Sequence, residues 1–140
     1  MVYGRIRRVK PKVMGAWTQK LLLIECAEPS ILPNLVEAIK LWDSLQWSMV
    51  LIQTIPGVIQ VKTDPTLEDL GLLGRTFTQV EKDTGRILSA TIYVVPNASV
   101  TTIAHEIGHA LGFDHTQITG HLMHATKPSI NDLRGLERKT

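Results

Sequence analysis

The chain has 140 residues, of which 44% are hydrophobic and 20% are charged, and its formal net charge is +2. This length suits one domain with a hydrophobic core, and the composition is that of a globular protein rather than of a disordered or fibrous one. No hydrophobic run approaches the roughly 20 residues that a membrane helix needs, so we expect no membrane partner.

The charge is distributed unevenly along the chain. Residues 1–16 hold five basic residues and no acidic residue, whereas residues 17–140 hold 10 basic and 13 acidic residues. We therefore predict a basic N-terminal arm, residues 1–16, and a single domain, residues 17–140. The arm is interpreted as a solvated segment. Binding of an anionic partner such as nucleic acid, or covering of the acidic domain, are the alternatives.

Two features bear on the compartment. The basic N-terminal stretch contains no hydrophobic segment of the kind that a signal peptide has. Cys26 is the only cysteine, so no internal disulfide is expected. Both favour a cytoplasmic location, unless the chain was trimmed from a secreted precursor.

Hydrophobic periodicity predicts a strand and a helix near the start of the domain. Leu21–Cys26 is a continuous hydrophobic run, which is typical of a central strand covered on both faces. Ser30 is the predicted N-cap of the helix that follows. Hydrophobic residues recur at helical spacing at Ile31, Leu35, Ile39 and Trp42, and this stripe is expected to pack on the sheet.

Four further strands are predicted, over residues 47–54, 58–63, 73–80 and 87–95, and residues 64–71 are expected to form a loop. A short turn at residues 83–86 makes the last two strands antiparallel neighbours, with residues 73–80 at the edge of the sheet. The unpaired N–H and C=O groups of an edge strand can pair with a peptide backbone. The polar Thr76 and Thr78 also suit a strand that simply faces solvent.

A helix running to about Leu111, capped by Asn97 or Ser99, carries the most informative residues of the chain. His105 and His109 are four residues apart, so their imidazoles lie on one face of this helix and can hold one metal ion. Glu106 follows the first histidine and can reach a water on that ion without binding the ion itself.

The chain can return to this metal ion after the helix ends. Gly112 ends the helix because glycine enters the left-handed conformation without steric cost. His115 then supplies a third nitrogen. Three protein ligands leave one coordination position open, which is typical of a catalytic zinc rather than a structural one. The alternative is an ordinary buried helix with solvated histidines. That alternative does not explain why all five histidines fall between residues 105 and 124.

The motif HExxHxxGxxH from His105 to His115, followed by Met123, resembles the metzincin metallopeptidases and, within them, the matrixins, the family of matrix-metalloproteinase-like catalytic domains. The resemblance implies that the three histidines bind a catalytic Zn²⁺ and that Glu106 is the general base. It places Met123 in a "Met-turn" under the metal, packed but not bound. Met123 could also be a core residue that fills a gap, and the two interpretations are compatible.

The resemblance also implies an α+β fold with an α/β upper subdomain. Its parts would be a five-stranded twisted mixed sheet with an antiparallel edge strand, three helices, the zinc helix at the cleft floor, the Met-turn and a C-terminal helix. The C-terminal helix is expected over residues 129–137, capped by Ser129, with Asp132 below the Met-turn. The edge strand that pairs with substrate is expected to include Leu73, Gly74, Arg75 and Thr76.

The sequence departs from the matrixin pattern in three places. His124 and Ala125 stand where matrixins have tyrosine and proline, and His124 could form a hydrogen bond near the cleft. Otherwise His121 and His124 are interpreted as ordinary loop histidines. The acidic loops that hold the family's structural zinc and calcium have no counterpart, so one metal ion is predicted. Residues 1–16 lack the cysteine of the family's latency segment, which makes this a minimal form.

The leading hypothesis is a zinc-dependent endopeptidase that hydrolyses extended polypeptides, with a water on the metal ion as nucleophile and Glu106 as general base. The alternatives are a zinc hydrolase of another amide, such as a peptidoglycan cross-link, and a non-catalytic zinc-bearing module that binds peptides. The intact Glu106 argues against the last, because binding alone needs no base. A peptide or protein substrate is the expected partner, nucleic acid is not expected, and the oligomeric state is not readable.

Overall fold

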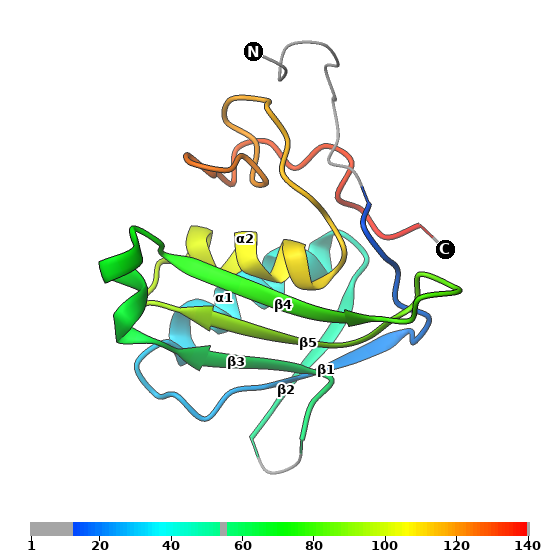
Figure 1. Cartoon of the computed structure of the whole chain (residues 1–140), viewed down its shortest axis with the longest axis horizontal. Helices are drawn as coiled ribbons and strands as arrows, with labels where there is room; N and C mark the ends of the chain where they lie inside the picture. Colours follow the sequence, from blue (N-terminus) through cyan, green and yellow to red (C-terminus); the bar gives the residue numbers. More distant parts are fainter. Residues whose placement is uncertain (1–12, 54–55, 140) are drawn as a thin grey trace.

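The structure is a computed structural model that describes residues 13–53 and 56–139. It has an α+β fold in which two α-helices lie on the same face of a five-stranded mixed sheet (Figure 1). The elements in chain order are β1 (Leu21–Glu25), α1 (Leu32–Ser44), β2 (Ser48–Ile52), β3 (Ile59–Thr63), the 3₁₀ helix η2 (Pro65–Leu70), β4 (Gly74–Val80), β5 (Ile87–Val94) and α2 (Val100–Ala110).

The strand order is β2-β1-β3-β5-β4, which places β4 at one edge of the sheet. The pairs β1–β2, β1–β3 and β3–β5 are parallel, and only β4 runs antiparallel, against β5. The parallel pair β1–β2 is joined by α1, because parallel neighbours need a crossover connection. The predicted edge position and direction of residues 73–80 are therefore confirmed.

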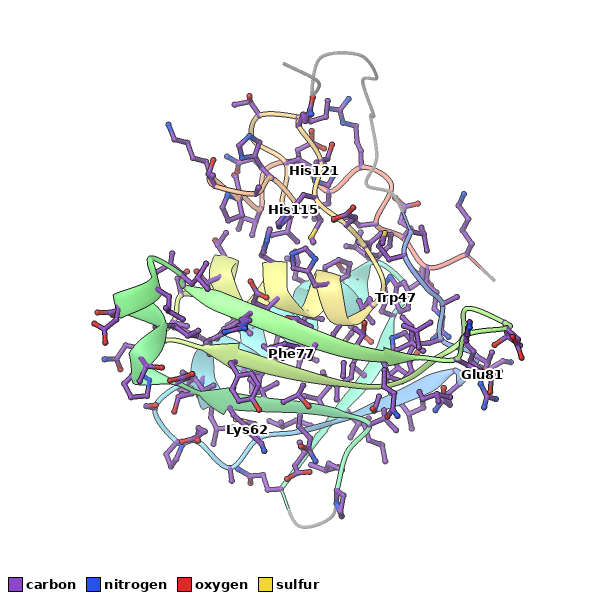
Figure 2. All side chains as sticks on the ribbon, in the orientation of Figure 1. Trp47, Lys62, Phe77, Glu81, His115 and His121 are labelled. Atoms are coloured by element: carbon purple, nitrogen blue, oxygen red, sulfur yellow. The ribbon has the colours of Figure 1, made fainter. Side chains whose placement is uncertain are left out.

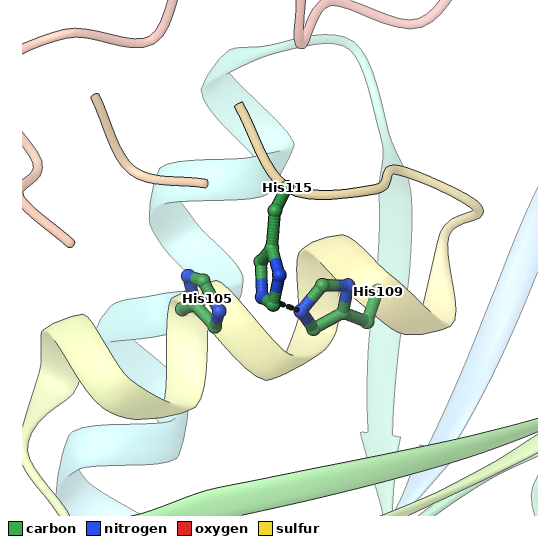
Figure 3. A group of neighbouring side chains, drawn as sticks. All are labelled: His105, His109 and His115. Atoms are coloured by element: carbon green, nitrogen blue, oxygen red, sulfur yellow. Dashed lines mark hydrogen bonds between the residues drawn. The ribbon is translucent and has the colours of Figure 1, made fainter. Parts of the chain in front are cut away.

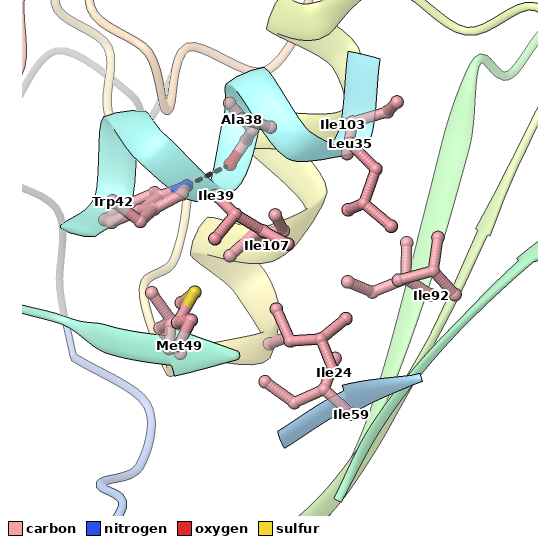
Figure 4. Close-up of a cluster of buried hydrophobic side chains, with 14 of the residues drawn as sticks. Ile24, Leu35, Ala38, Ile39, Trp42, Met49, Ile59, Ile92, Ile103 and Ile107 are labelled. Atoms are coloured by element: carbon pink, nitrogen blue, oxygen red, sulfur yellow. Dashed lines mark hydrogen bonds between the residues drawn. The ribbon is translucent and has the colours of Figure 1, made fainter. Parts of the chain in front are cut away.

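The core lies between this sheet and the two helices (Figure 4). The predicted stripe of α1 is buried, and Leu35 and Trp42 are completely inaccessible. The indole Nε1 of Trp42 donates a hydrogen bond to the carbonyl of Ala104 on α2, at 2.9 Å. Each fully buried side chain of this size contributes roughly 1.5–3 kcal/mol of hydrophobic stabilisation. This packing fixes α2, which carries the histidine motif, against α1.

Two expectations about the first strand and helix were wrong. β1 is not covered on both faces, since the helices occupy one face only, and Leu21 on the other face is 50% exposed. Ser30 is not the N-cap of α1, because the cap residue is Ile31 and no side chain caps the helix. If Ser30 were the N-cap, Pro33 would be the third helical residue. Proline has no N–H, so it could not donate the hydrogen bond that an N-cap side chain accepts from this position.

Residues 64–71, predicted as a loop, contain the short helix η2. The carboxylate of Asp64 caps it by accepting a hydrogen bond from the Thr66 N–H at 2.9 Å. Pro65 supports the first turn because its φ angle is already helical. The helix ends at Gly71, which has a φ of +73°.

The predicted C-terminal helix over residues 129–137 is not formed. This stretch consists of turns and bends, and local side-chain hydrogen bonds compete with the helical pattern there. The Ser129 hydroxyl accepts from the Asn131 N–H, and the Asp132 carboxylate accepts from the Arg134 N–H, each at 3.1 Å. Gly135 has a φ of +80°, which a helix does not accommodate. The third helical element of the described chain is η2 instead.

The start of the described chain packs against the end of α2. Met14 N–H donates to the Gly112 carbonyl at 2.5 Å, and the indole of Trp17 donates to the Ala110 carbonyl at 2.8 Å. Residues 13–16 of the predicted basic arm thus contact the body of the protein, while residues 1–12 lie outside the described residues. In the part of the chain that the structure describes, no helix has the length and hydrophobicity to cross a membrane.

Candidate metal centre

The helix α2 places two histidines on one face (Figure 3). Its N-cap is Ser99, one of the two predicted caps, and the Ser99 hydroxyl accepts a hydrogen bond from the Thr102 N–H at 3.1 Å. From this start, His105 and His109 follow at helical spacing, with their ring centroids 4.8 Å apart.

Gly112 turns the chain back over the helix, as predicted. It has a φ of +107°, and a Cβ atom at this position would lie only 2.2 Å from the Gly15 carbonyl oxygen. Both the backbone conformation and the space therefore require glycine. The return brings His115 above α2, with its Nε2 atom 3.0 Å from Nε2 of His109.

Three histidines, His105, His109 and His115, lie close enough to hold one metal ion. Their candidate ligand atoms all lie within 4.8 Å of one another. Three imidazole nitrogens suit a divalent transition metal ion. The predicted ligand triad is thus brought together by the fold.

Two of the rings are held in the tautomer that a metal site needs. His105 Nδ1 lies 2.7 Å from the Leu122 carbonyl, and His109 Nδ1 lies 2.8 Å from the Phe113 carbonyl. A carbonyl oxygen only accepts, so each Nδ1 carries the proton and each Nε2 keeps its lone pair for a metal. The Phe113 ring is anchored by stacking on Trp42, with ring centroids 6.0 Å apart.

Burial keeps these histidines neutral. It lowers the pKa of His105 to about 4, and it also lowers the pKa values of His109 and His115. The cause is the cost of placing a charged imidazolium away from water. Neutral imidazole is the form that binds metal ions, so the triad is prepared for a metal at neutral pH.

The Glu106 carboxylate lies against β4. Among the described residues, the cluster that could hold an ion comprises the histidines without this carboxylate. Its Oε1 atom accepts a hydrogen bond from the Thr76 hydroxyl at 2.7 Å. A Cβ atom on Gly74 would lie 2.6 Å from Glu106 Cγ, so glycine there makes room for the side chain. Burial raises the pKa of Glu106 to about 7, although the bond from Thr76 opposes this shift.

Met123 is completely buried and packs against α2. A Cβ atom on Gly108 would lie 2.4 Å from Met123 Sδ, so the missing side chain of Gly108 admits the methionine. The preceding residue, Leu122, supplies the carbonyl that orients His105. The segment around Met123 therefore acts on the triad through packing and through one hydrogen bond.

His121 is not an ordinary loop histidine, and the sequence reasoning missed its role. Its ring is completely buried, on the same side of α2 as His115 (Figure 2). Its Nε2 lies 2.8 Å from the Arg134 carbonyl and its Nδ1 accepts from the Met123 N–H at 3.0 Å. It thereby joins the Met123 segment to the C-terminal segment. Only its place beside Met123 in the sequence could have pointed to this role.

His124 and Asp132 make local contacts instead of the expected ones. His124 Nδ1 accepts from the N–H groups of Thr126 and Lys127, at 3.3 and 3.1 Å, and so closes a turn. Asp132 contacts the Met123 segment through its backbone, because its carbonyl accepts from the Leu122 N–H at 3.0 Å. Its carboxylate pairs with Arg134.

A cleft of about 730 Å³ runs between β4 and α2. The four predicted edge residues, Leu73, Gly74, Arg75 and Thr76, all line it, as do His105, Glu106, His109 and His115. Gly74 and Thr76 contact Glu106, whereas the Arg75 guanidinium lies over the Phe77 ring at 5.0 Å. The three candidate metal ligands, a carboxylate and an edge strand thus share one cleft.

The register of β4 shows which backbone groups are free. Leu73 C=O accepts from Val95 N–H at 3.0 Å, and hydrogen-bonded pairs alternate along an antiparallel ladder. On the far side of β5, Ala90, the partner of Thr78, donates to Val58 instead. Gly74, Thr76 and Thr78 therefore direct their N–H and C=O groups away from β5.

The sequence was also compared with known proteins. No family model matches the chain, and the search of curated proteins gives no match. The interpretation of the cleft accordingly depends on its own residues.

Proposed function

We propose that the protein is a zinc-dependent endopeptidase of the metzincin type, similar to the matrixins. The observation that carries this proposal is the arrangement in the cleft. Three neutral imidazoles converge there, and the Nε2 atoms of His105 and His109 each keep a lone pair for a metal ion. The carboxylate of Glu106, which is not one of the candidate ligands, lies beside them. Such a set is typical of metal-assisted hydrolysis rather than of a structural metal site.

In this proposal His105, His109 and His115 hold one Zn²⁺ ion. When bound, the ion supplies Lewis acidity, which activates water and polarises a carbonyl group. Glu106 takes the proton from the attacking water and then delivers it to the nitrogen of the leaving amine. The position of Glu106 next to His105, but turned toward β4, keeps the carboxylate close to the site and off the metal.

The proposed substrate is an extended peptide that adds to the edge of β4. The outward N–H and C=O groups of Gly74, Thr76 and Thr78 offer main-chain hydrogen bonds, the usual basis of strand addition. Hydrophobic side chains line the cleft near both ends of β4, with Leu72 before the strand and Val80 at its end. Peptides with hydrophobic residues on both sides of the cleaved bond should therefore be preferred.

The test is cleavage of quenched fluorescent peptides by the protein, with and without a chelator, followed by restoration with Zn²⁺. Glu106→Ala should retain zinc and lose cleavage, because only the proton carrier is removed. His109→Ala should lose zinc as well. His124→Ala is the matched control, a histidine of the same region outside the triad, and should retain both zinc and activity.

Each alternative has its own outcome. Zinc-loaded protein that binds peptides without turnover would identify a binding module, and cleavage confined to peptidoglycan cross-links would identify another amide hydrolase. Undiminished cleavage by Glu106→Ala would refute the mechanism, and an unchanged zinc content in His109→Ala would refute the ligand assignment.

A further inference from the structure

We propose that Thr76 is a positioning residue that holds the Glu106 carboxylate in the orientation for proton transfer; this inference rests on the proposed hydrolysis. Thr76 lies on the edge strand, where its backbone is expected to pair with substrate. Its side chain also forms a hydrogen bond with Glu106, which the sequence pattern did not indicate.

The contact between the two side chains is short and specific. The Thr76 hydroxyl lies 2.7 Å from Glu106 Oε1 and 3.2 Å from the Glu106 backbone carbonyl. Thr76 has a single hydroxyl proton to donate. Of the two oxygens, Oε1 is closer than the backbone carbonyl oxygen, and as a carboxylate oxygen it is the stronger acceptor. The hydroxyl therefore donates to Oε1.

Gly74 completes the restraint from the same face of β4. A Cβ atom there would lie 2.8 Å from both Cδ and Oε2 of Glu106, so the carboxylate lies directly against the glycine backbone. One neighbour on the strand thus binds Oε1 while the other limits the position of Oε2. Together they restrict rotation about the last side-chain bond of Glu106.

This arrangement leaves Oε2 as the oxygen that exchanges a proton. Within the described residues, no side-chain oxygen or nitrogen is both fully buried and without a hydrogen-bond partner. Oε2 accepts no hydrogen bond from these residues, so it is open to the cleft that Glu106 lines. In the proposed reaction Oε2 accepts one proton from the attacking water as its O–H bond breaks. The same proton is then transferred to the leaving nitrogen, and Glu106 is regenerated as a carboxylate.

The kinetic test compares Thr76→Val, which has the same shape without the hydroxyl, with Thr76→Ser, which keeps the hydroxyl. We expect Thr76→Val to lower kcat by about 10-fold or more, the usual effect of losing one hydrogen bond to a charged group, with KM changed less than about twofold. Thr76→Ser should restore most of the rate. Thr91→Val is the matched control, since Thr91 pairs with Phe77 from the neighbouring strand β5 and is not among the residues that line the cleft.

A second measurement does not depend on turnover. The Tm values of wild type, Thr76→Val, Glu106→Ala and the double variant form a cycle that reports the coupling of the two side chains. We expect the two single losses to be non-additive by at least about 2 °C. Additive losses would show that the hydrogen bond is not made in solution and would overturn the proposal.

The outcomes separate this proposal from the proposed function. If the zinc-loaded wild type cleaves peptides and Thr76→Val cleaves them equally well, the role of Thr76 is refuted and the hydrolase remains. If the wild type cleaves no peptide, both proposals fail. A loss of kcat that Thr76→Ser does not restore, with additive Tm changes, would mean that Thr76 is merely structural.

Discussion

Gly108 stands in the last turn of α2, and glycine within a helix costs up to roughly 1 kcal/mol relative to alanine. The site shows why it is there. A Cβ atom at this position would meet Met123 Sδ at 2.4 Å and Cζ2 of Trp42 at 3.1 Å. Glycine at this position therefore lowers the intrinsic helix propensity of α2 but allows Met123 to pack closely against the helix.

Replacement of Gly108 by alanine should consequently destabilise the protein. We expect Gly108→Ala to lower the free energy of unfolding by about 1–3 kcal/mol, because overpacking outweighs the better helix propensity. Urea denaturation measures this, with Thr101→Ala in the first turn of the same helix as the control. A Gly108→Ala protein as stable as the wild type would show that Met123 has room to move.

Asp132 is a second residue with a definite local role. Its carboxylate lies 2.6 Å from the Arg134 guanidinium, and hydrogen bonding from Arg134 lowers the pKa of Asp132 from 3.8 to about 2. A carboxyl group whose pKa is lower in the folded state stabilises the fold above its unfolded pKa. That contribution is lost as the pH falls toward the folded pKa.

The effect of Asp132→Asn on Tm should therefore depend on pH. The wild type should have the higher Tm above pH 4, and the difference should shrink between about pH 4 and pH 2, where Asp132 becomes protonated. Thermal melts across this range measure it. In an Arg134→Gln background the effect of Asp132→Asn should become smaller, because only the backbone N–H of residue 134 then remains as a donor to this carboxylate. A Tm difference that is constant with pH would exclude the ion pair as its source.

Among the elements, β4 has two different edges. One pairs with β5, and the other presents the free backbone groups of Gly74, Thr76 and Thr78 to the cleft. Proline lacks an N–H, so it is tolerated in a strand only where that N–H has no partner in the sheet. The two edges can therefore be separated by proline substitution.

Thr78→Pro should leave the fold intact and weaken peptide binding, seen as a KM increase of several-fold with a nearly unchanged Tm. Phe77→Pro, one residue earlier, removes a hydrogen bond to β5 and should lower the Tm by several degrees. Peptidase kinetics and thermal melts distinguish the two. If Thr78→Pro has the greater effect on Tm, the register deduced for the free groups is incorrect.

The elements also differ in how well the sequence predicted them. The buried stripe of α1 and the five strands were predicted from hydrophobic patterns that the sequence displays directly. These elements were confirmed, although β1 is covered on one face only. The predicted caps were not equally reliable, since Ser99 caps α2 whereas Ser30 and Ser129 cap no helix. A serine hydroxyl finds a partner in a turn as readily as at a helix end, so its presence alone does not decide between them.

At the scale of the whole molecule, the C-terminal segment after α2 has no helix or extended strand within residues 112–139. It is held by separate contacts with distant residues. Trp47 Nε1 donates to the Leu136 carbonyl at 2.8 Å, and the Arg138 guanidinium donates to the Lys20 carbonyl at 3.0 Å. His115 lies in this segment, so a metal ion would join it to α2.

Metal removal should therefore lower the stability of the whole protein. An ion present at about 1,000 times its Kd stabilises the folded state by about 4 kcal/mol, which corresponds to a Tm increase on the order of 10 °C for a domain of this size. Thermal melts with Zn²⁺ and with a chelator measure this. His109→Ala should abolish the difference. Identical melts of the wild type in both conditions would refute a metal site at the triad.

The sequence by itself determined the edge position of β4 and the histidine triad, and its resemblance to the matrixins implied the α+β class. The edge position depends on a short turn, and the triad depends on the spacing of two histidines along one helix and of a third beyond the glycine that ends it, all of which are local. Only the tertiary structure decided that Thr76 and Gly74 hold Glu106, that Gly108 admits Met123, and that His121 joins two segments without regular structure. Each of those contacts joins residues that are far apart along the chain or in irregular segments. Their geometry depends on how the core orients α2 against β4, which no local pattern specifies.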